Sequence, residues 1–255
     1  MKSTYQALID WVHDENDFQP IALLGGYGSG KTSVAKKIAS ELAKLSVQDY
    51  TVRRPILIRL GNITRYSAVD GILGGLFTSE VPVRNFNLPN FQKLNEKGHF
   101  LIILDGFDEM KHSMSWADFK AQVQALLQLH KERSKVLLLG RPSAFLSEDE
   151  ERHILKGQRR LDENWVRLPN WPSFRELELR EFTPAQRRDF VVKYIAHNGS
   201  ANLGRLMRAR FFCPSISRLR KWRHLSRSPL LPCHLNFACR ADAVYGSIVP
   251  SMRSR

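Results

Sequence analysis

A cluster of glycines near the amino terminus constrains the fold of this chain more than any other feature. Residues 25–32 read GGYGSGKT, between the apolar run Ile21–Leu24 and a segment with helical periodicity. Glycine is unfavourable inside regular structure because it loses the most backbone freedom on folding. The cluster is therefore expected to form a loop whose backbone turns sharply or closely approaches another group.

The segments around this loop predict a parallel sheet. Apolar runs that suit buried strands occur at Ile21–Leu24, Pro55–Leu60, Phe100–Leu104 and Lys135–Gly140, with a weaker fifth at Arg175–Leu179. Between them, helical spacing of apolar residues recurs over residues 3–13, 34–45, 68–77, 89–97 and 116–130. Apolar strands that alternate with helices indicate an α/β fold, with a parallel sheet of roughly five strands covered on both faces.

A second part of the chain is expected to begin near residue 181. The sequence Thr183-Pro184-Ala185-Gln186 combines the spacing of a capping box with proline at the first helical position. We expect a helix from there to about Ile195, and we divide the chain into a core at 1–180 and a partial helical region with a basic tail at 181–255. After Arg210 the periodicity fades, so the tail could be poorly ordered, truncated or frameshifted.

Charge is distributed unevenly. The chain has a net charge of +14, yet residues 1–150 carry 18 Lys and Arg against 17 Asp and Glu. Residues 151–255 carry 21 against 8. A basic half of this kind suits nucleic acid, an anionic surface or an acidic partner domain that the chain itself does not contain.

The glycine-rich loop fits the phosphate-binding pattern G-x-x-x-x-G-K-[ST], with the strand before it and the helix after it that this pattern requires. Glycines let successive backbone N–H groups surround a phosphate, Lys31 would reach the β- and γ-phosphates, and Thr32 would offer its hydroxyl to Mg²⁺. The following helix directs its positive end at the same anion. The candidate nucleotide-binding residues are Gly25, Gly26, Tyr27, Gly28, Ser29, Gly30, Lys31, Thr32 and Ser33.

Three acidic residues follow the third apolar strand, in the sequence DGFDE. Asp105 ends the strand, so its carboxylate is expected at the carboxyl edge of the sheet, where it could hold Mg²⁺ directly or through water. One of Asp108 and Glu109 could orient or deprotonate an attacking water. The alternative is that these two acids only stabilise the start of the next helix.

Arg141 directly follows the strand KVLLLG and is expected at the same edge of the sheet. There it could contact a γ-phosphate and report its presence. A surface arginine in a loop is the alternative interpretation. Pro142 favours an extended backbone at Arg141.

Together, GGYGSGKT, LIILDGFDEM and LLLGRPSAF resemble the NACHT domain of STAND-class P-loop NTPases, over about residues 5–196. The sequence departs from the family at the third motif, where members read T-S-R-P and this chain has Gly140-Arg141-Pro142. The segment LELREFTPAQRRDFVVKYI is similar to the family's exit from the sheet into a small helical domain. Ser228-Pro229-Leu230-Leu231 is faintly similar to a family segment whose proline lies near adenine, which makes Pro229 a further candidate cofactor-binding residue.

The resemblance implies a P-loop NTPase of the ASCE type, a slowly hydrolysing switch that uses ATP, ADP and Mg²⁺. ADP would hold a closed form, and ATP would promote opening and self-association through the NTPase domain, in innate immunity or antiviral defence. It also implies that a C-terminal sensor region is missing from this chain. Its catalytic candidates are Lys31, Asp108, Glu109 and Arg141, and its metal candidates are Thr32 and Asp105.

Other functions stay open. A P-loop kinase could use the same loop, a nucleic-acid-binding module could use the basic run Arg205–Arg223, and a scaffold could have lost nucleotide altogether. Cys213, Cys233 and Cys239, with His224 and His234 nearby, match no zinc spacing, and their sparse, odd count fits a reducing compartment. The sequence has neither a signal-peptide core nor an apolar run long enough to cross a bilayer, so we expect a cytoplasmic protein without a membrane partner.

Overall fold

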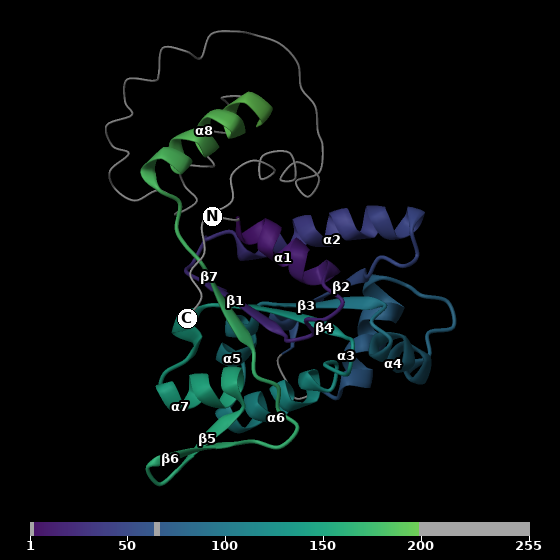
Figure 1. The fold of residues 1–255 in the computed structure, drawn as a ribbon, viewed down its shortest axis with the longest axis vertical. Helices are drawn as coiled ribbons and strands as arrows, with labels where there is room; N and C mark the ends of the chain where they lie inside the picture. Colours follow the sequence, from purple (N-terminus) through teal and green to yellow (C-terminus); the bar gives the residue numbers. More distant parts are fainter. Residues whose placement is uncertain (1–2, 64–66, 199–255) are drawn as a thin grey trace. The chain divides into compact units, whose positions relative to one another are not determined.

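The central element of the computed structural model, which describes residues 3–63 and 67–198, is a five-stranded sheet (Figure 1). Its strand order is β2-β3-β4-β1-β7, and all neighbouring strands are parallel. The strands are β1 (Ile21–Gly25), β2 (Arg54–Arg59), β3 (Phe100–Asp105), β4 (Lys135–Gly140) and β7 (Arg175–Leu179). The predicted α/β fold is therefore confirmed, and each predicted strand end lies within one residue of the observed one.

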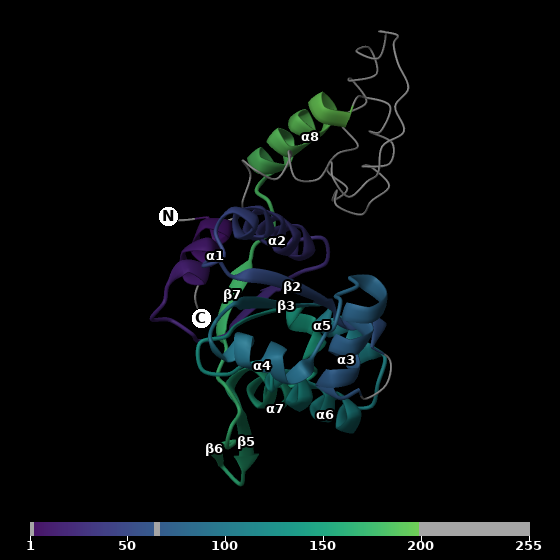
Figure 2. The same cartoon turned by 90° about the vertical axis from the view of Figure 1, so that its right-hand side faces the viewer.

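Helices cover both faces of this sheet (Figures 1 and 2). One face packs against α1 (Thr4–His13) and α2 (Lys31–Gln48), through strand residues such as Ile21 and Leu23. The other face, which carries Ala22 and Leu24, packs against four further helices: α3 (Val69–Gly75), α4 (Leu88–Glu96), α5 (Phe107–His112) and α6 (Trp116–Leu127). In the three central strands β1, β3 and β4, adjacent residues enter different cores, which explains why these strands are apolar almost throughout.

Side-chain caps define several helix starts. Ser3 Oγ accepts a hydrogen bond from the backbone N–H of Gln6 (3.1 Å) at the start of α1. At α8 (Pro184–Asn198), the Thr183 N–H donates to Gln186 Oε1 (2.9 Å) and the Gln186 N–H donates to Thr183 Oγ1 (3.3 Å). The sequence predicted this reciprocal capping box, which satisfies two backbone donors that the helix itself leaves free.

Some elements were not predicted. A hairpin of β5 (Gln158–Leu161) and β6 (Asn164–Arg167) turns at Asp162, whose φ of 54° is in the left-handed region. The helix expected over 68–77 ends at Gly75 and continues as a π-helical turn, Leu76–Glu80. A short helix α7 (Glu148–Glu151) leads into a second π-helical turn, Arg152–Lys156.

The described residues belong to two compact units, of which the first extends to Arg180 and the second begins at Glu181 and includes α8. None of the helices within 3–63 and 67–198 is both long and apolar enough to cross a membrane.

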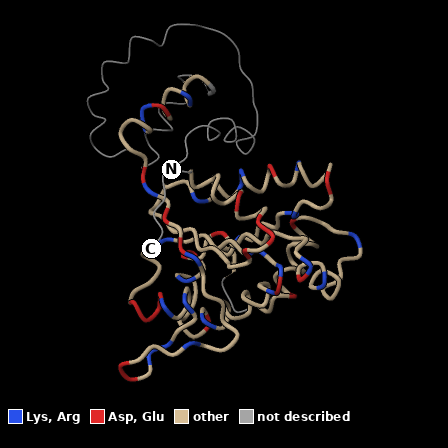
Figure 3. Tube along the Cα trace, viewed as in Figure 1, with Lys and Arg blue, Asp and Glu red and all other residues tan. Residues whose placement is uncertain are grey.

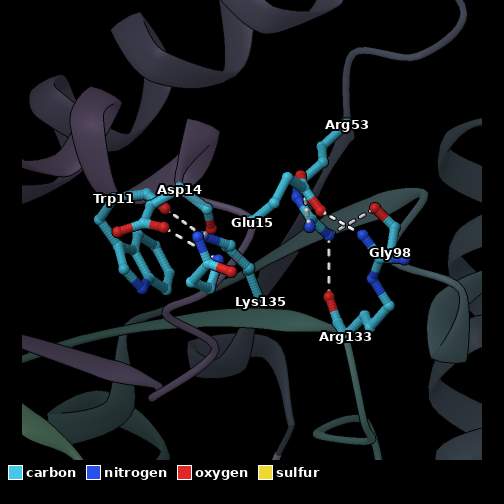
Figure 4. Close-up of polar contacts among 8 residues, drawn as sticks. Trp11, Asp14, Glu15, Arg53, Gly98, Arg133 and Lys135 are labelled. Carbon is cyan, nitrogen blue, oxygen red and sulfur yellow. Dashed lines mark hydrogen bonds and ion pairs between the residues drawn. The ribbon is translucent and has the colours of Figure 1, made fainter.

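Buried cations lie at the amino edge of the sheet, where β2, β3 and β4 begin (Figure 4). Lys135, the first residue of β4, is fully buried and donates to the carbonyl oxygens of Trp11 and Asp14. Arg53, just before β2, donates to the carbonyl oxygens of Gly98 and Arg133 and pairs with Glu15 (3.0 Å). These contacts fix the segment after α1 to the starts of three strands.

Candidate functional site

The loop between β1 and α2 has the geometry that its glycines suggested. Gly30 precedes α2 with a φ of 95°, and Gly28 has a φ of 71°, so both occupy the left-handed region that other residues avoid. A Cβ atom at Gly25 would lie 2.6 Å from Ser29 Oγ and 3.0 Å from the carbonyl oxygen of Leu179. A side chain at residue 25 would therefore overlap Ser29 and press on the backbone of β7.

Lys31, the first residue of α2, turns back over this loop. Its Nζ donates to the carbonyl oxygens of Gly25 (2.7 Å) and Gly26 (3.0 Å). Burial lowers the pKa of Lys31, the charge of Arg141 lowers it further, and Asp108 and Asp105 oppose this shift. The ammonium is thus near Asp105 at the end of β3 and Asp108 in α5, but it bonds to neutral carbonyl groups, which a phosphate could replace.

The two predicted metal-binding residues lie next to each other. Thr32 Oγ1 donates to Asp105 Oδ1 (3.1 Å), which joins the first turn of α2 to the end of β3. Within the described part of the chain, no three His, Cys, Asp or Glu side chains form a metal-binding group. A hydroxyl and one carboxylate suit Mg²⁺, which commonly takes one or two protein ligands and completes its shell with phosphate and water.

Asp108 and Glu109 lie in the first turn of α5 and differ in their surroundings. Asp108 is buried and forms an ion pair with Nε of Arg141 (2.8 Å). Glu109 is exposed, and its carboxylate lies beside Gly61. Acids in a first turn are also favourable for the helix itself.

Arg141 follows β4 and connects three parts of the site. Besides its ion pair with Asp108, its guanidinium carbon lies 4.9 Å from the ring centroid of Tyr27, in the phosphate loop. Gly140 stands where the family has a polar residue, and a Cβ there would lie 3.3 Å from Cβ of Phe107. A side chain at residue 140 would thus press on Phe107, and Arg141 contacts Asp108 and Tyr27.

The structure brings most sequence-predicted residues to one edge of the sheet. The group that lies together consists of Gly25 to Thr32, Asp105, Asp108 and Arg141. Ser33 follows Thr32 in α2. Pro229 and the three cysteines lie outside the described residues. The contact of Tyr27 with Arg141 and that of Gly61 with Glu109 were not predicted, although Tyr27 lies in the predicted phosphate loop and Gly61 directly follows a predicted strand.

The residues present fit a nucleotide phosphate. Ser29 Oγ is buried in the loop and has no hydrogen-bond partner among the described residues. A buried polar atom without a partner is unfavourable. A phosphate oxygen in the loop would accept the hydrogen bond that this hydroxyl now lacks.

These features define a P-loop NTPase in which β4 separates the phosphate-loop strand β1 from the acidic strand β3. The family model described as "NACHT domain" matches residues 19–198, and the chain belongs to this family. Membership and fold together imply that the domain binds a nucleotide, usually with Mg²⁺.

Comparisons with individual proteins and solved structures give low sequence identities. An uncharacterized WD repeat-containing protein of Nostoc sp. (strain PCC 7120) is 27% identical over 206 residues, which cover 74% of this chain. The chain spans only 13% of the length of that relative. The Orc1 protein of Aeropyrum pernix, solved in complex with DNA, matches 74% of this chain and 48% of its own, with 14% identity and a TM-score of 0.43. A structure of Pif1 helicases at forked DNA matches 81% of this chain and 51% of the helicase chain, with 16% identity and a TM-score of 0.31.

Proposed function

We propose that the chain is an ATP-binding switch that requires Mg²⁺ and hydrolyses ATP slowly. The observation that carries the proposal is the meeting of Lys31, Thr32, Asp105 and Arg141 at the carboxyl edge of the sheet. In the proposed cycle, ADP holds a closed form, and exchange for ATP opens the protein and promotes self-association. The proposed cycle of closing and opening rests on membership of the NACHT family, and so does the proposed setting in innate immunity or antiviral defence.

Each side chain has a proposed role. The backbone of residues 25–30 and the ammonium of Lys31 hold the phosphates, and Ser29 and Ser33 add hydroxyl donors. Thr32 and Asp105 hold Mg²⁺, which would neutralise charge on the phosphate oxygens when bound. Glu109 orients or deprotonates water, Asp108 holds Arg141, and Arg141 contacts the γ-phosphate. Pro229 lies outside the described residues, and its proposed contact with the base comes from the resemblance of its segment to the family.

The whole protein is proposed to be larger than this chain. Residues 1–180 form the nucleotide-binding core, and residues 181–255 supply a partial helical region. A sensor region elsewhere in the protein would control the switch, and we place the protein in the cytoplasm. WD repeats belong to the Nostoc relative by name, and we propose that repeats of some kind serve as the sensor here.

Titration calorimetry with ATP, ADP and GTP, with and without Mg²⁺, tests binding. We expect ATP and ADP to bind, and Mg²⁺ to strengthen ATP binding. Glu109→Gln is expected to retain ATP but to turn it over at least about tenfold more slowly, with Glu80→Gln, an exposed residue at the end of the π-helical turn, as control. If no nucleotide binds, the proposed function is wrong.

Two alternatives have separate tests. A P-loop kinase would transfer phosphate to a nucleoside in an acceptor screen, although a strand between β1 and β3 is typical of the hydrolysing branch. A nucleic-acid-binding module would shift DNA or RNA in a low-salt gel. Its dense basic run, Arg205–Arg223, lies outside the described residues. Along the described residues, positive and negative side chains are interspersed (Figure 3).

A further inference from the structure

The carboxylate of Glu109 lies in a notch between two glycines from different parts of the chain. Gly61 belongs to a 3-10 turn, Leu60–Asn62, that follows β2, and Gly106 (φ 88°) precedes α5. A Cβ atom at Gly61 would lie 2.2 Å from Oε2 of Glu109 and 3.2 Å from its Cβ. A Cβ at Gly106 would lie 3.3 Å from the same Oε2. The carboxylate thus occupies space that a side chain at Gly61 would fill.

The sheet register explains why these residues meet. β2 and β3 are parallel neighbours, with Arg59 beside Asp105, so the segments after both strands leave the sheet at the same edge. Farther along, Ser113 Oγ donates to the carbonyl oxygen of Ile63 (3.2 Å) and holds the end of α5 against the segment that follows β2. The location of Glu109 therefore depends on the exit from β2 as well as on its own helix.

We propose that Gly61 is a positioning residue for Glu109. Without a side chain at residue 61, the carboxylate lies close to the strand end that carries Asp105. With a side chain there, the carboxylate must move away. This inference rests on the proposed function, in which Glu109 acts on the attacking water, because a general base must lie within hydrogen-bond reach of the proton that it removes.

Gly61→Ala tests this proposal directly, because the new methyl group would overlap the carboxylate of Glu109. The closest contact is with the far end of a flexible, exposed side chain, so the Glu109 carboxylate can swing into solvent, and the 3.2 Å contact with Cβ of Glu109 requires a shift of only a few tenths of an ångström. We expect ATP affinity to change less than about twofold, and turnover to fall about 10- to 100-fold, since a displacement of about 1 Å can have this effect. Crystal structures of both proteins would show the displaced carboxylate directly.

Two further variants of the chain serve as controls in this experiment. Gly71→Ala, on the exposed side of α3, adds a methyl group with no atom within 4 Å, and we expect normal turnover. The double variant Gly61→Ala/Glu109→Gln should turn over ATP no more slowly than Glu109→Gln alone, because Gly61 acts through Glu109. Unfolding by urea shows whether all variants stay folded.

The outcomes separate the inference from the proposed function. Slow turnover in Glu109→Gln with parent-like turnover in Gly61→Ala overturns the role of Gly61 and leaves the proposed function intact. A further loss in the double variant also overturns it, since Gly61 would then act independently of Glu109. Parent-like turnover in Glu109→Gln, or no turnover in the unsubstituted chain, contradicts both.

Discussion

At the amino edge of the sheet, Lys135 and Arg53 are buried, whereas at the carboxyl edge Lys31 and Arg141 are partly exposed. The two cations of the amino edge bond to carbonyl groups of four residues and to Glu15. At the carboxyl edge, Lys31 bonds to two carbonyl groups of the glycine-rich loop, and 32% of the Arg141 side chain is exposed. Both edges carry positive charge, but their cations have different surroundings.

The difference follows from the cost of burying charge. A buried cation is tolerated when it bonds to several fixed groups, as Lys135 and Arg53 do at the amino edge (Figure 4), although Nε of Arg53 has no partner among the described residues. At the carboxyl edge, the loop contains an unpartnered hydroxyl, Ser29, and carbonyl groups that a ligand can displace from Lys31. We therefore expect substitutions at the amino edge to change stability and those at the carboxyl edge to change nucleotide binding.

Lys31→Ala should have the largest effect. It removes the cation that would donate to the β- and γ-phosphates, so ATP affinity should fall at least about 1000-fold, while the free energy of unfolding changes by less than about 1 kcal/mol. Calorimetry with Mg²⁺ and urea unfolding measure the two quantities. Lys36→Ala, exposed on the same helix, is the control. Parent-like ATP affinity in Lys31→Ala would exclude the loop as the binding site.

Lys135→Met should show the opposite pattern. The methionine keeps the length of the side chain but leaves the carbonyl groups of Trp11 and Asp14 without their donor. We expect the free energy of unfolding to fall by about 2–4 kcal/mol, with ATP affinity unchanged. Lys131→Met changes an exposed lysine nearby and serves as control. Equal losses of stability in both variants would contradict a special role for the amino edge.

Lys135 also predicts a pH dependence of stability. Burial, chiefly, lowers its pKa to about 8 from an ordinary value of 10.5. Between these values the unfolded chain keeps a proton that the folded chain releases, so this group makes stability rise with pH. The parent protein should gain about 1–2 kcal/mol relative to Lys135→Met between pH 7.5 and 9.5, as measured by urea unfolding. A constant difference would show that the lysine titrates normally.

Asp105→Asn should weaken the dependence on Mg²⁺. The amide loses the charge that attracts the ion, although it can still accept the hydrogen bond from Thr32. We expect the strengthening of ATP binding by Mg²⁺ to fall about tenfold, roughly 1.4 kcal/mol, with little change in its absence. Calorimetry with and without the ion measures this, with Asp70→Asn on α3 as control. A loss of the same size without Mg²⁺ would place Asp105 outside the metal site.

Much of the fold could be predicted, and the reason lies in the strands. Runs such as Lys135–Gly140 enter two cores at once and are apolar almost throughout, which leaves few alternatives. The hairpin β5–β6 gave no such signal, because QRRL and NWVR are mostly polar and exposed and their turn lacks glycine. Nor did the sequence show that Lys135 would be fully buried, since lysine at the start of a strand is usually exposed.

The residues of the site were predicted by type, but their pairings were not. A motif shows that Lys31, Asp105 and Arg141 suit a phosphate and its metal ion. That Asp108 pairs with Arg141, or that Glu109 lies against Gly61, depends on how separate strand ends meet. These contacts join residues far apart in the chain, so no local pattern records them.

Tyr27→Ala should have the smallest effect and the most selective one. The Tyr27 ring supports the guanidinium of Arg141 at 4.9 Å, and 74% of the tyrosine is exposed. A cation–π contact at an exposed position is worth about 0.5–1 kcal/mol, so ATP affinity should fall about two- to fivefold. Because Arg141 is proposed to contact the γ-phosphate, ADP affinity should stay the same.

Calorimetry with both nucleotides measures this selectivity, and Tyr27→Phe, which keeps the ring, should behave like the parent. In an Arg141→Ala background, Tyr27→Ala should have no further effect on ATP, since the two residues act as one unit. An equal loss of ATP and ADP affinity would instead assign Tyr27 to the shape of the loop. In that case the ion pair with Asp108 would be the contact that positions Arg141 at the carboxyl edge of the sheet.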